Sequence, residues 1–290
     1  MWSWLKGLFG GRRPKLDHSA EMVLKEEADW QRLIAEWPYP LRLVPGTEAT
    51  AAWFEEAAIG AREGFSPILI TPRTLKIPKD LREIADEDIA SPETIVDTYV
   101  RKLLFESWAL DNKTGPYDIR DASPEQVAAA LAEAEDYNRG GAYSFDREFF
   151  NDVQELPPDA PEPQPQTEQF NDINSFYLNA PYPQVAITRL PTADSWRIPL
   201  LLGLGGWNNC PDTAALAAFA RRWKLLYGAE LAAVTFDTLE FVVARPPATF
   251  DEATRLAKEH YIAGNEVYFE QISDYIAGLR TARRWYFWWD

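Results

Sequence analysis

Trp285-Tyr286-Phe287-Trp288-Trp289-Asp290 ends the chain with five consecutive aromatic side chains. Each of these side chains can bury roughly 150–250 Å², so such a segment must pack into a core or against a partner. Bulky residues occupy both odd and even positions, which favours a strand covered on both faces. The segment therefore predicts a closing β-strand near the centre of a sheet.

The residues just before this segment predict a hairpin followed by a helix. Residues 231–236 and 239–244 are apolar or alternating and flank Asp237-Thr238, which indicates a β-hairpin. Thr249 and Glu252 have the spacing of a capping box, which predicts a helix directly after the hairpin.

Farther from the closing segment, the N-terminal part of the chain alternates strands and helices. Residues 41–44 and 66–71 predict two strands with a helix between them, and this order favours a parallel pair. Residues 184–188 predict a third strand, in the C-terminal part of the chain. Ser123, followed by Pro124 and Gln126, predicts a capped helix start.

Proline and acidic residues accumulate between these two parts, and residues 148–183 contain no lysine or arginine. This composition predicts an acidic, proline-rich linker or insertion, either a plain connector or an arm that wraps a basic partner. We expect an α/β protein with a mixed sheet flanked by helices. Its parts are a lead-in and helix (1–37), an N-terminal α/β part (38–147), the linker (148–183) and a C-terminal α/β domain (184–290).

The overall charge narrows the choice of partners. The 290 residues include 45 acids and 29 bases, giving a formal net charge of −16. Repulsion from phosphates disfavours direct nucleic-acid binding, whereas a basic protein is attracted. A single cysteine and the lack of a secretory pattern predict a cytoplasmic location. Residues 1–9, which contain Trp2 and Trp4, leave peripheral membrane contact as an alternative.

Several motifs in the C-terminal third resemble one known family. They are Gly205-Gly206-Trp207-Asn208-Asn209-Cys210-Pro211, Arg222-Trp223, Tyr227-Gly228-Ala229-Glu230, Ala244-Arg245-Pro246-Pro247 and the closing aromatic segment. In this order they are similar to the bacterial family called "domain of unknown function 4253". The resemblance implies one compact unit whose sheet N-terminal strands can join, and it implies no activity or cofactor. It also implies a second cysteine in residues 261–266, which this chain lacks, so a two-cysteine role is not expected.

Candidate site residues gather around the glycine-rich turn before residue 212. Cys210 near a helix start is a candidate nucleophile with His260 as its base, although a lone cysteine is commonly a buried apolar residue. The binding candidates are Trp207, Asn208, Asn209, Asp212 and Trp288, with Asp212 also a candidate helix cap. Two histidines and one cysteine are too few for an ordinary structural zinc site, and we expect neither metal nor cofactor.

Three functional hypotheses follow from these patterns. The leading one is a cytoplasmic protein-interaction module, such as an immunity-type factor that neutralises a basic bacterial toxin, because acidity and abundant tryptophan suit a protein interface. The second is an enzyme that uses the Trp207–Asp212 turn with Cys210. The third is a peripheral membrane protein anchored by residues 1–9.

Overall fold

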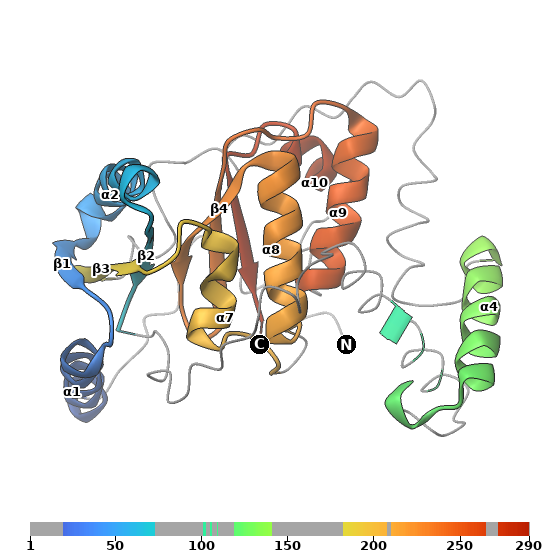
Figure 1. Ribbon diagram of the computed structural model, residues 1–290, viewed down its shortest axis with the longest axis horizontal. Coiled ribbons are helices and arrows are strands. Elements are labelled where there is room, and N and C mark those ends of the chain that lie inside the picture. The colour runs from blue at the N-terminus through green and yellow to red at the C-terminus, as the bar shows by residue number, and fades with distance from the viewer. Residues whose placement is uncertain are drawn as a thin grey trace.

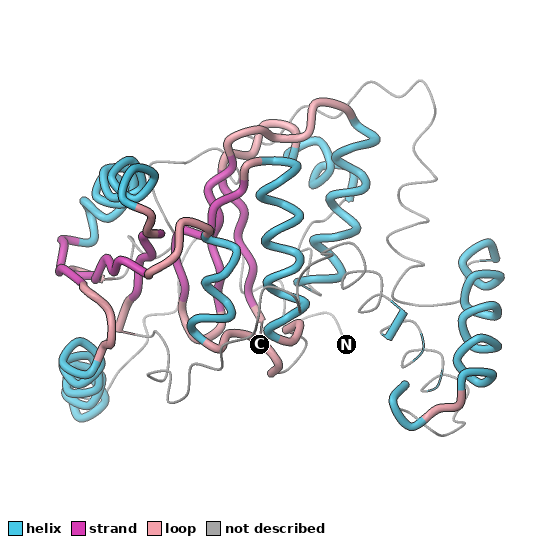
Figure 2. The backbone as a smooth tube through the Cα atoms, viewed as in Figure 1, coloured by secondary structure: helices cyan, strands magenta, loops and turns pink. Residues whose placement is uncertain are grey.

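Six strands form one mixed sheet in the order β1-β3-β2-β4-β5-β6 (Figures 1 and 2). The computed structural model describes residues 20–72, 101–102, 105, 109, 119–140, 182–207, 210–264 and 272–289. The strands are β1 (Leu41–Pro45), β2 (Ser66–Ile70), β3 (Gln184–Leu190), β4 (Ala229–Val234), β5 (Thr238–Val243) and β6 (Arg284–Trp288). The helices in the described ranges are α1 (Ala20–Glu36), α2 (Ala49–Glu63), α4 (Pro124–Gly140), α7 (Ile198–Leu202), α8 (Thr213–Tyr227), α9 (Phe250–Gly264) and α10 (Ile272–Leu279). The predicted α/β class with a mixed sheet is confirmed.

The two halves of the chain share this sheet, because β3 lies between β1 and β2. Thr188 of β3 is opposite Leu41 of β1 on one side and opposite Ile68 of β2 on the other, and both pairings are antiparallel. The predicted parallel pairing of β1 with β2 is therefore wrong. The two strands do run in the same direction, but a strand from the C-terminal half separates them. The parallel neighbours are β2 and β4, joined at Leu69 and Ala233.

Helices cover the two faces of the sheet unequally. One face carries the large core, which combines α1, α7, α8, α9 and α10 with apolar residues of five strands. The other face carries a smaller core in which Trp53 of α2 packs with Val185, Ile187 and Leu69. Figure 1 shows α1 and α2 on opposite sides of β1 and β3. Because β3 is covered on both faces, residues 185–188 are all buried.

The closing aromatic strand is buried on one face and lies at an edge of the sheet. Among the described strands, β6 pairs with β5 alone, so the prediction of a central position is wrong. Trp285 and Phe287 are buried in the large core, whereas Tyr286 between them is 42% exposed. The aromatic density therefore reflects packing under α8 and α9 rather than a position between two strands.

Local signals for turns and helix starts are mostly confirmed. The hairpin of β4 and β5 turns at residues 235–237. In the box before α4, the Ser123 amide donates to Gln126 Oε1 at 2.8 Å, and the Gln126 amide donates back to Ser123 Oγ at 3.3 Å. Thr249 and Glu252 exchange the same pair of bonds before α9.

Two predicted regions lie outside the described residues. They are residues 1–9 and the predicted linker, except for its last two residues, 182–183. Within the part of the chain that the structure does describe, no helix has both the length and the apolar character needed to span a membrane.

Candidate functional site

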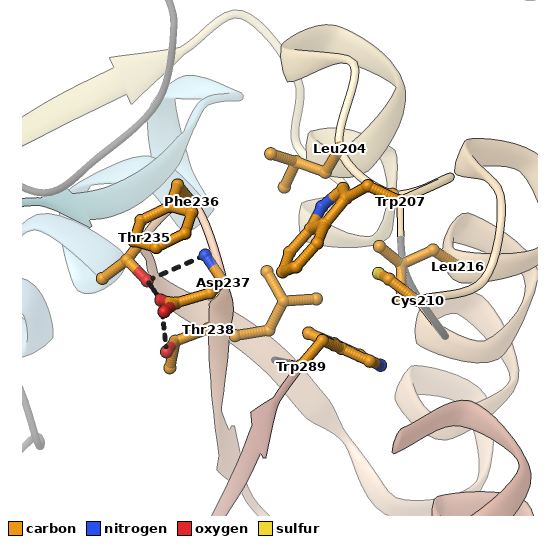
Figure 3. Close-up of a pocket in the computed structure, with 11 residues that line it drawn as sticks. Leu204, Trp207, Cys210, Leu216, Thr235, Phe236, Asp237, Thr238 and Trp289 are labelled. Carbon is orange, nitrogen blue, oxygen red and sulfur yellow. Dashed lines mark hydrogen bonds between the residues drawn. The ribbon is translucent and has the colours of Figure 1, made fainter. Parts of the chain in front are cut away.

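A shallow hollow lies where three elements of the C-terminal half meet (Figure 3). They are the loop between α7 and α8, the β4–β5 turn and the residue that follows β6. The hollow measures about 220 Å³, including the solvent at its mouth. Its lining consists of Leu204, Gly205, Trp207, Cys210, Leu216, Thr235, Phe236, Asp237, Thr238, Leu239 and Trp289.

Glycines allow the α7–α8 loop to fold tightly at one side of the hollow. Gly205 has φ +94°, and a Cβ there would lie 2.3 Å from the carbonyl oxygen of Pro211. The Gly206 amide donates to that same oxygen at 2.8 Å, and the Cys210 amide donates to the Trp207 carbonyl at 2.9 Å. Glycine is therefore required at position 205, and the closed loop holds Trp207 over the turn of the hairpin.

The β4–β5 turn holds a carboxylate at the opposite side of the hollow. Asp237 Oδ1 accepts hydrogen bonds from the hydroxyls of Thr235 at 2.6 Å and Thr238 at 3.1 Å. Asp237 Oδ2 accepts a bond from Trp288 Nε1 at 3.2 Å, and the Trp289 amide donates to the Asp237 carbonyl at 3.0 Å. These bonds fix the carboxylate and join the end of β6 to the turn, as the dashed lines in Figure 3 show for the threonines.

Aromatic rings from all three elements form the walls of the hollow. The Trp207 ring is stacked on Phe236 with a centroid distance of 6.2 Å, and it meets Trp289 edge to face at 6.5 Å. Phe236 is 49% exposed, whereas Trp289 is buried and its Nε1 donates to the Ala263 carbonyl at 3.0 Å. The hollow thus has one fixed aromatic wall and one that faces solvent.

Cys210 lines the hollow, but its surroundings favour the neutral thiol. Burial is the main cause that raises the pKa of Cys210 to about 12, and the charge of Asp212 adds to it, against a lowering hydrogen bond from the Gly206 backbone. A nucleophilic cysteine needs the opposite shift. At neutral pH this side chain therefore behaves as a small apolar group in the lining.

His260 lies outside the lining of the hollow, inside the aromatic core. Its ring packs against Trp285 at 4.6 Å, Phe287 at 4.8 Å and Trp223 at 5.0 Å. Its Nδ1 and the Tyr275 hydroxyl share a hydrogen bond of 2.6 Å, and burial lowers the pKa of His260 to about 3. Cys210 and His260 therefore make no contact that would let the histidine take the thiol proton.

The comparisons with known proteins point to one family. Residues 186–290 match the family described as "Domain of unknown function (DUF4253)". A search of curated proteins found no match, and neither did a search of solved structures. The resemblance inferred from the sequence is thereby confirmed for the C-terminal part of the chain. The DUF4253 match covers every residue that lines the hollow.

Within the DUF4253 segment, the candidate binding residues have different positions. Trp207 lines the hollow, and Trp288 supports it by its bond to Asp237. Asp212 is the N-cap of α8, where its carboxylate accepts from the Ala215 amide at 2.9 Å. Asn208 and Asn209 lie outside the described residues. In the described ranges, no group of three or more His, Cys, Asp or Glu residues is placed to hold a metal ion.

The candidates did not include the carboxylate of the hollow or two of its three aromatic rings. Phe236, Asp237 and Trp289 reach the hollow only because the hairpin turn and the end of β6 meet the α7–α8 loop. The available local signal was Asp237 in a predicted turn, and with 45 acids in the chain one carboxylate carries little information.

Proposed function

We propose that the protein is a cytoplasmic interaction module that binds a basic protein partner through the hollow beneath Trp207. One observation carries the proposal: an exposed aromatic surface lies beside a fixed carboxylate on a protein with formal net charge −16. Aromatic side chains are frequent anchors in protein interfaces, and a strong acidic field accelerates the approach of a basic partner. Neutralisation of a bacterial toxin by an immunity-type factor is the form of this function that we favour.

The test begins with purified protein and candidate basic proteins from the native host, starting with products of neighbouring genes. A stable complex of fixed stoichiometry and protection of cells from the partner's toxicity are the expected results. Phe236→Ala should weaken the complex, whereas Phe54→Ala should leave it unchanged. Phe54 is a suitable control because it is 41% exposed, close to the 49% of Phe236, but lies on α2. A complex insensitive to both changes, or no complex at all, would contradict the proposal.

An enzyme that uses Cys210 is the alternative, because the thiol does line the hollow. The raised pKa of Cys210 and the separate location of His260 make this arrangement less favourable than binding. Cys210→Ser separates the two proposals. A nucleophile would lose its reaction with this change, whereas a binding surface would keep its affinity within about twofold, since the change removes only one buried sulfur contact.

A further inference from the structure

The edge of the sheet at β1 carries backbone groups that no strand pairs with. Among the described strands, β1 is the first in the sheet order and pairs with β3 alone. The Arg189 amide bonds to the Pro40 carbonyl at 2.9 Å, so the even-numbered residues of β1 are the ones that bond to β3. The amides and carbonyls of Leu41 and Leu43 therefore point away from β3, and they have no backbone partner among the described residues.

The helices at this end of the sheet leave the edge open to another strand. Trp53 of α2 packs on Leu69 of β2 and Val185 of β3, and its Nε1 donates to the Pro67 carbonyl at 3.1 Å. On β1 itself, the apolar side chain of Leu43 is 40% exposed. Figure 1 shows β1 at the rim of the sheet, with α1 and α2 on its two sides. Open edges of this kind are where a sheet can add a strand from another chain.

The sequence of β1 makes this edge complementary to itself. Two copies of β1 can lie antiparallel about a twofold axis, with Leu41 of one copy opposite Leu43 of the other. Each of the two Leu41–Leu43 pairs then exchanges two hydrogen bonds, which uses every outward group of both residues. Pro45 lacks an N–H, but this register does not need one there. Leu41 and Leu43 share a face of the sheet, so the exposed Leu43 of each copy is covered by Leu41 of the other.

The charges at the axis are compatible with this pairing. Arg42 lies between the two leucines and would meet Arg42 of the second copy. In each copy, however, Glu56 accepts from Arg42 at 3.1 Å and from Arg189 at 2.8 Å, and Glu63 lies 3.9 Å from Arg189. Two carboxylates thus accompany two guanidinium groups. At longer range the formal net charge of −16 on each copy opposes association, and salt screens this repulsion.

We propose that β1 is a dimerisation edge through which two copies of this chain join their sheets by antiparallel pairing. The assembly ends at two copies, because the pairing uses the open edge of both β1 strands. Since β1 has only five residues, the contact is small and the dimer is transient, with a dissociation constant above about 10 µM. No residue of β1 lines the hollow beneath Trp207, so this surface is separate from the proposed partner site.

Sedimentation equilibrium of the full chain tests the proposal over about 10 µM to about 1 mM protein. The average mass should rise from one chain toward two, and it should rise further in about 0.5 M than in about 0.05 M sodium chloride. Amide exchange in the same samples locates the contact. The Leu41 and Leu43 amides should exchange fast in the dilute monomer and about tenfold more slowly when about nine-tenths of the chains are dimeric. The Arg42 and Val44 amides face β3 in both states and should not change.

Variants of the edge separate this contact from other modes of association. Leu43→Pro removes one outward N–H and no bond to β3, so it should keep the fold and abolish the dimer. Leu43→Lys keeps the N–H but places a charge in the contact, and it should weaken the dimer at least about tenfold. Leu225→Lys is the matched control, because Leu225 is a 63% exposed leucine on α8. It should dimerise like the wild type.

Melting temperatures of the three variants show whether each one remains folded. A wild type that stays monomeric at every concentration and salt would overturn the proposal. A dimer that both Leu43 variants retain, or one in which the Leu41 and Leu43 amides still exchange fast, would overturn it as well.

Discussion

The two ends of the sheet are held to their helices by different kinds of contact. Around β1 and β3, side-chain hydrogen bonds join helices to strands beside the apolar packing of Trp53. Trp37 Nε1 donates to Thr188 Oγ1 at 2.8 Å, and Glu56 accepts from Arg42 at 3.1 Å and from Arg189 at 2.8 Å. Around β5 and β6 the contacts are aromatic rings packed against Trp223, with Phe287 stacked on it and Phe241 and Trp285 edge to face. Polar bonds specify which strands meet, since each donor needs a particular acceptor. Ring packing depends instead on filling space.

Removal of the central ring of the aromatic end should have the largest effect. Trp223 is 1% exposed, stacks on Phe287 at 5.1 Å and touches Phe219, Phe241, His260 and Trp285. Trp223→Ala should lower the free energy of unfolding by about 3–5 kcal/mol, measured by urea denaturation. Leu225→Ala on the same helix, at 63% exposure, should cost under about 0.5 kcal/mol. A loss below 1 kcal/mol for Trp223→Ala would show that this end is not held by packing.

The aromatic end should also respond to acid first. The pKa of His260 is lowered by burial from 6.5 to about 3. Between these two pKa values, His260 binds a proton in the unfolded chain but not in the folded one. The contribution of His260 to stability is therefore fully present above the unfolded pKa and is lost as the pH falls from 6.5 toward 3. Each pH unit in this window lowers the free energy of unfolding by about 1.4 kcal/mol. The loss between pH 7 and pH 4.5 should therefore be about 2–3 kcal/mol.

His260→Phe isolates this contribution from that of the carboxylates. The variant should be less stable than the wild type at pH 7, because the Tyr275 hydroxyl loses its hydrogen bond. Its stability should nevertheless fall less on acidification, and the difference between the two pH profiles should match the histidine contribution. Parallel profiles would contradict the assignment of a neutral, buried His260.

The polar end should show a smaller effect, at lower pH. Burial raises the pKa of Glu56, but hydrogen bonds from Arg189 and Arg42 outweigh it, so the pKa lies below its usual 4.5. Its contribution is present above the unfolded pKa and is lost as the pH falls through the folded value. Because both arginines are partly exposed, with side-chain exposures of 40% and 47%, Glu56→Gln should cost only about 1–2 kcal/mol in urea denaturation.

Glu55→Gln is the matched control for this prediction, since Glu55 is the exposed neighbour of Glu56 on α2. Its effect should stay within about 0.5 kcal/mol. Equal losses for the two variants would mean that removal of a negative charge, rather than the contacts of Glu56, governs the effect.

Features that depend on neighbouring residues could be predicted from the sequence, whereas features that depend on contacts between distant residues could not. Capping pairs such as Thr249 with Glu252 and the hairpin of β4 and β5 depend on residues close in the chain, and these predictions are confirmed. The insertion of β3 between β1 and β2 depends on contacts over a long separation, such as Trp37 with Thr188, which no periodicity encodes. The aromatic content of β6 predicted burial, but burial comes from helices as well as from neighbouring strands, so the central position did not follow.

The candidate site was predictable only in part, for the same reason. Trp207 and Cys210 lie in one loop, which the sequence indicates by its closely spaced glycines. Phe236, Asp237 and Trp289 join this loop through the register of β4, β5 and β6, which the sequence pattern leaves open.

Hydrogen exchange of individual amides on the intact protein tests most directly whether β3 joins the two halves in one sheet. The Arg189 amide bonds to Pro40 and the Gly46 amide bonds to Pro183, so even-numbered residues of β1 face β3 and Leu41 and Leu43 face away. We predict slow exchange for consecutive amides of β3, at Val185, Ala186, Ile187 and Thr188 alike, and fast exchange for Leu43. Alternating fast and slow amides along β3 would mean that it is an edge strand, and would contradict the shared sheet.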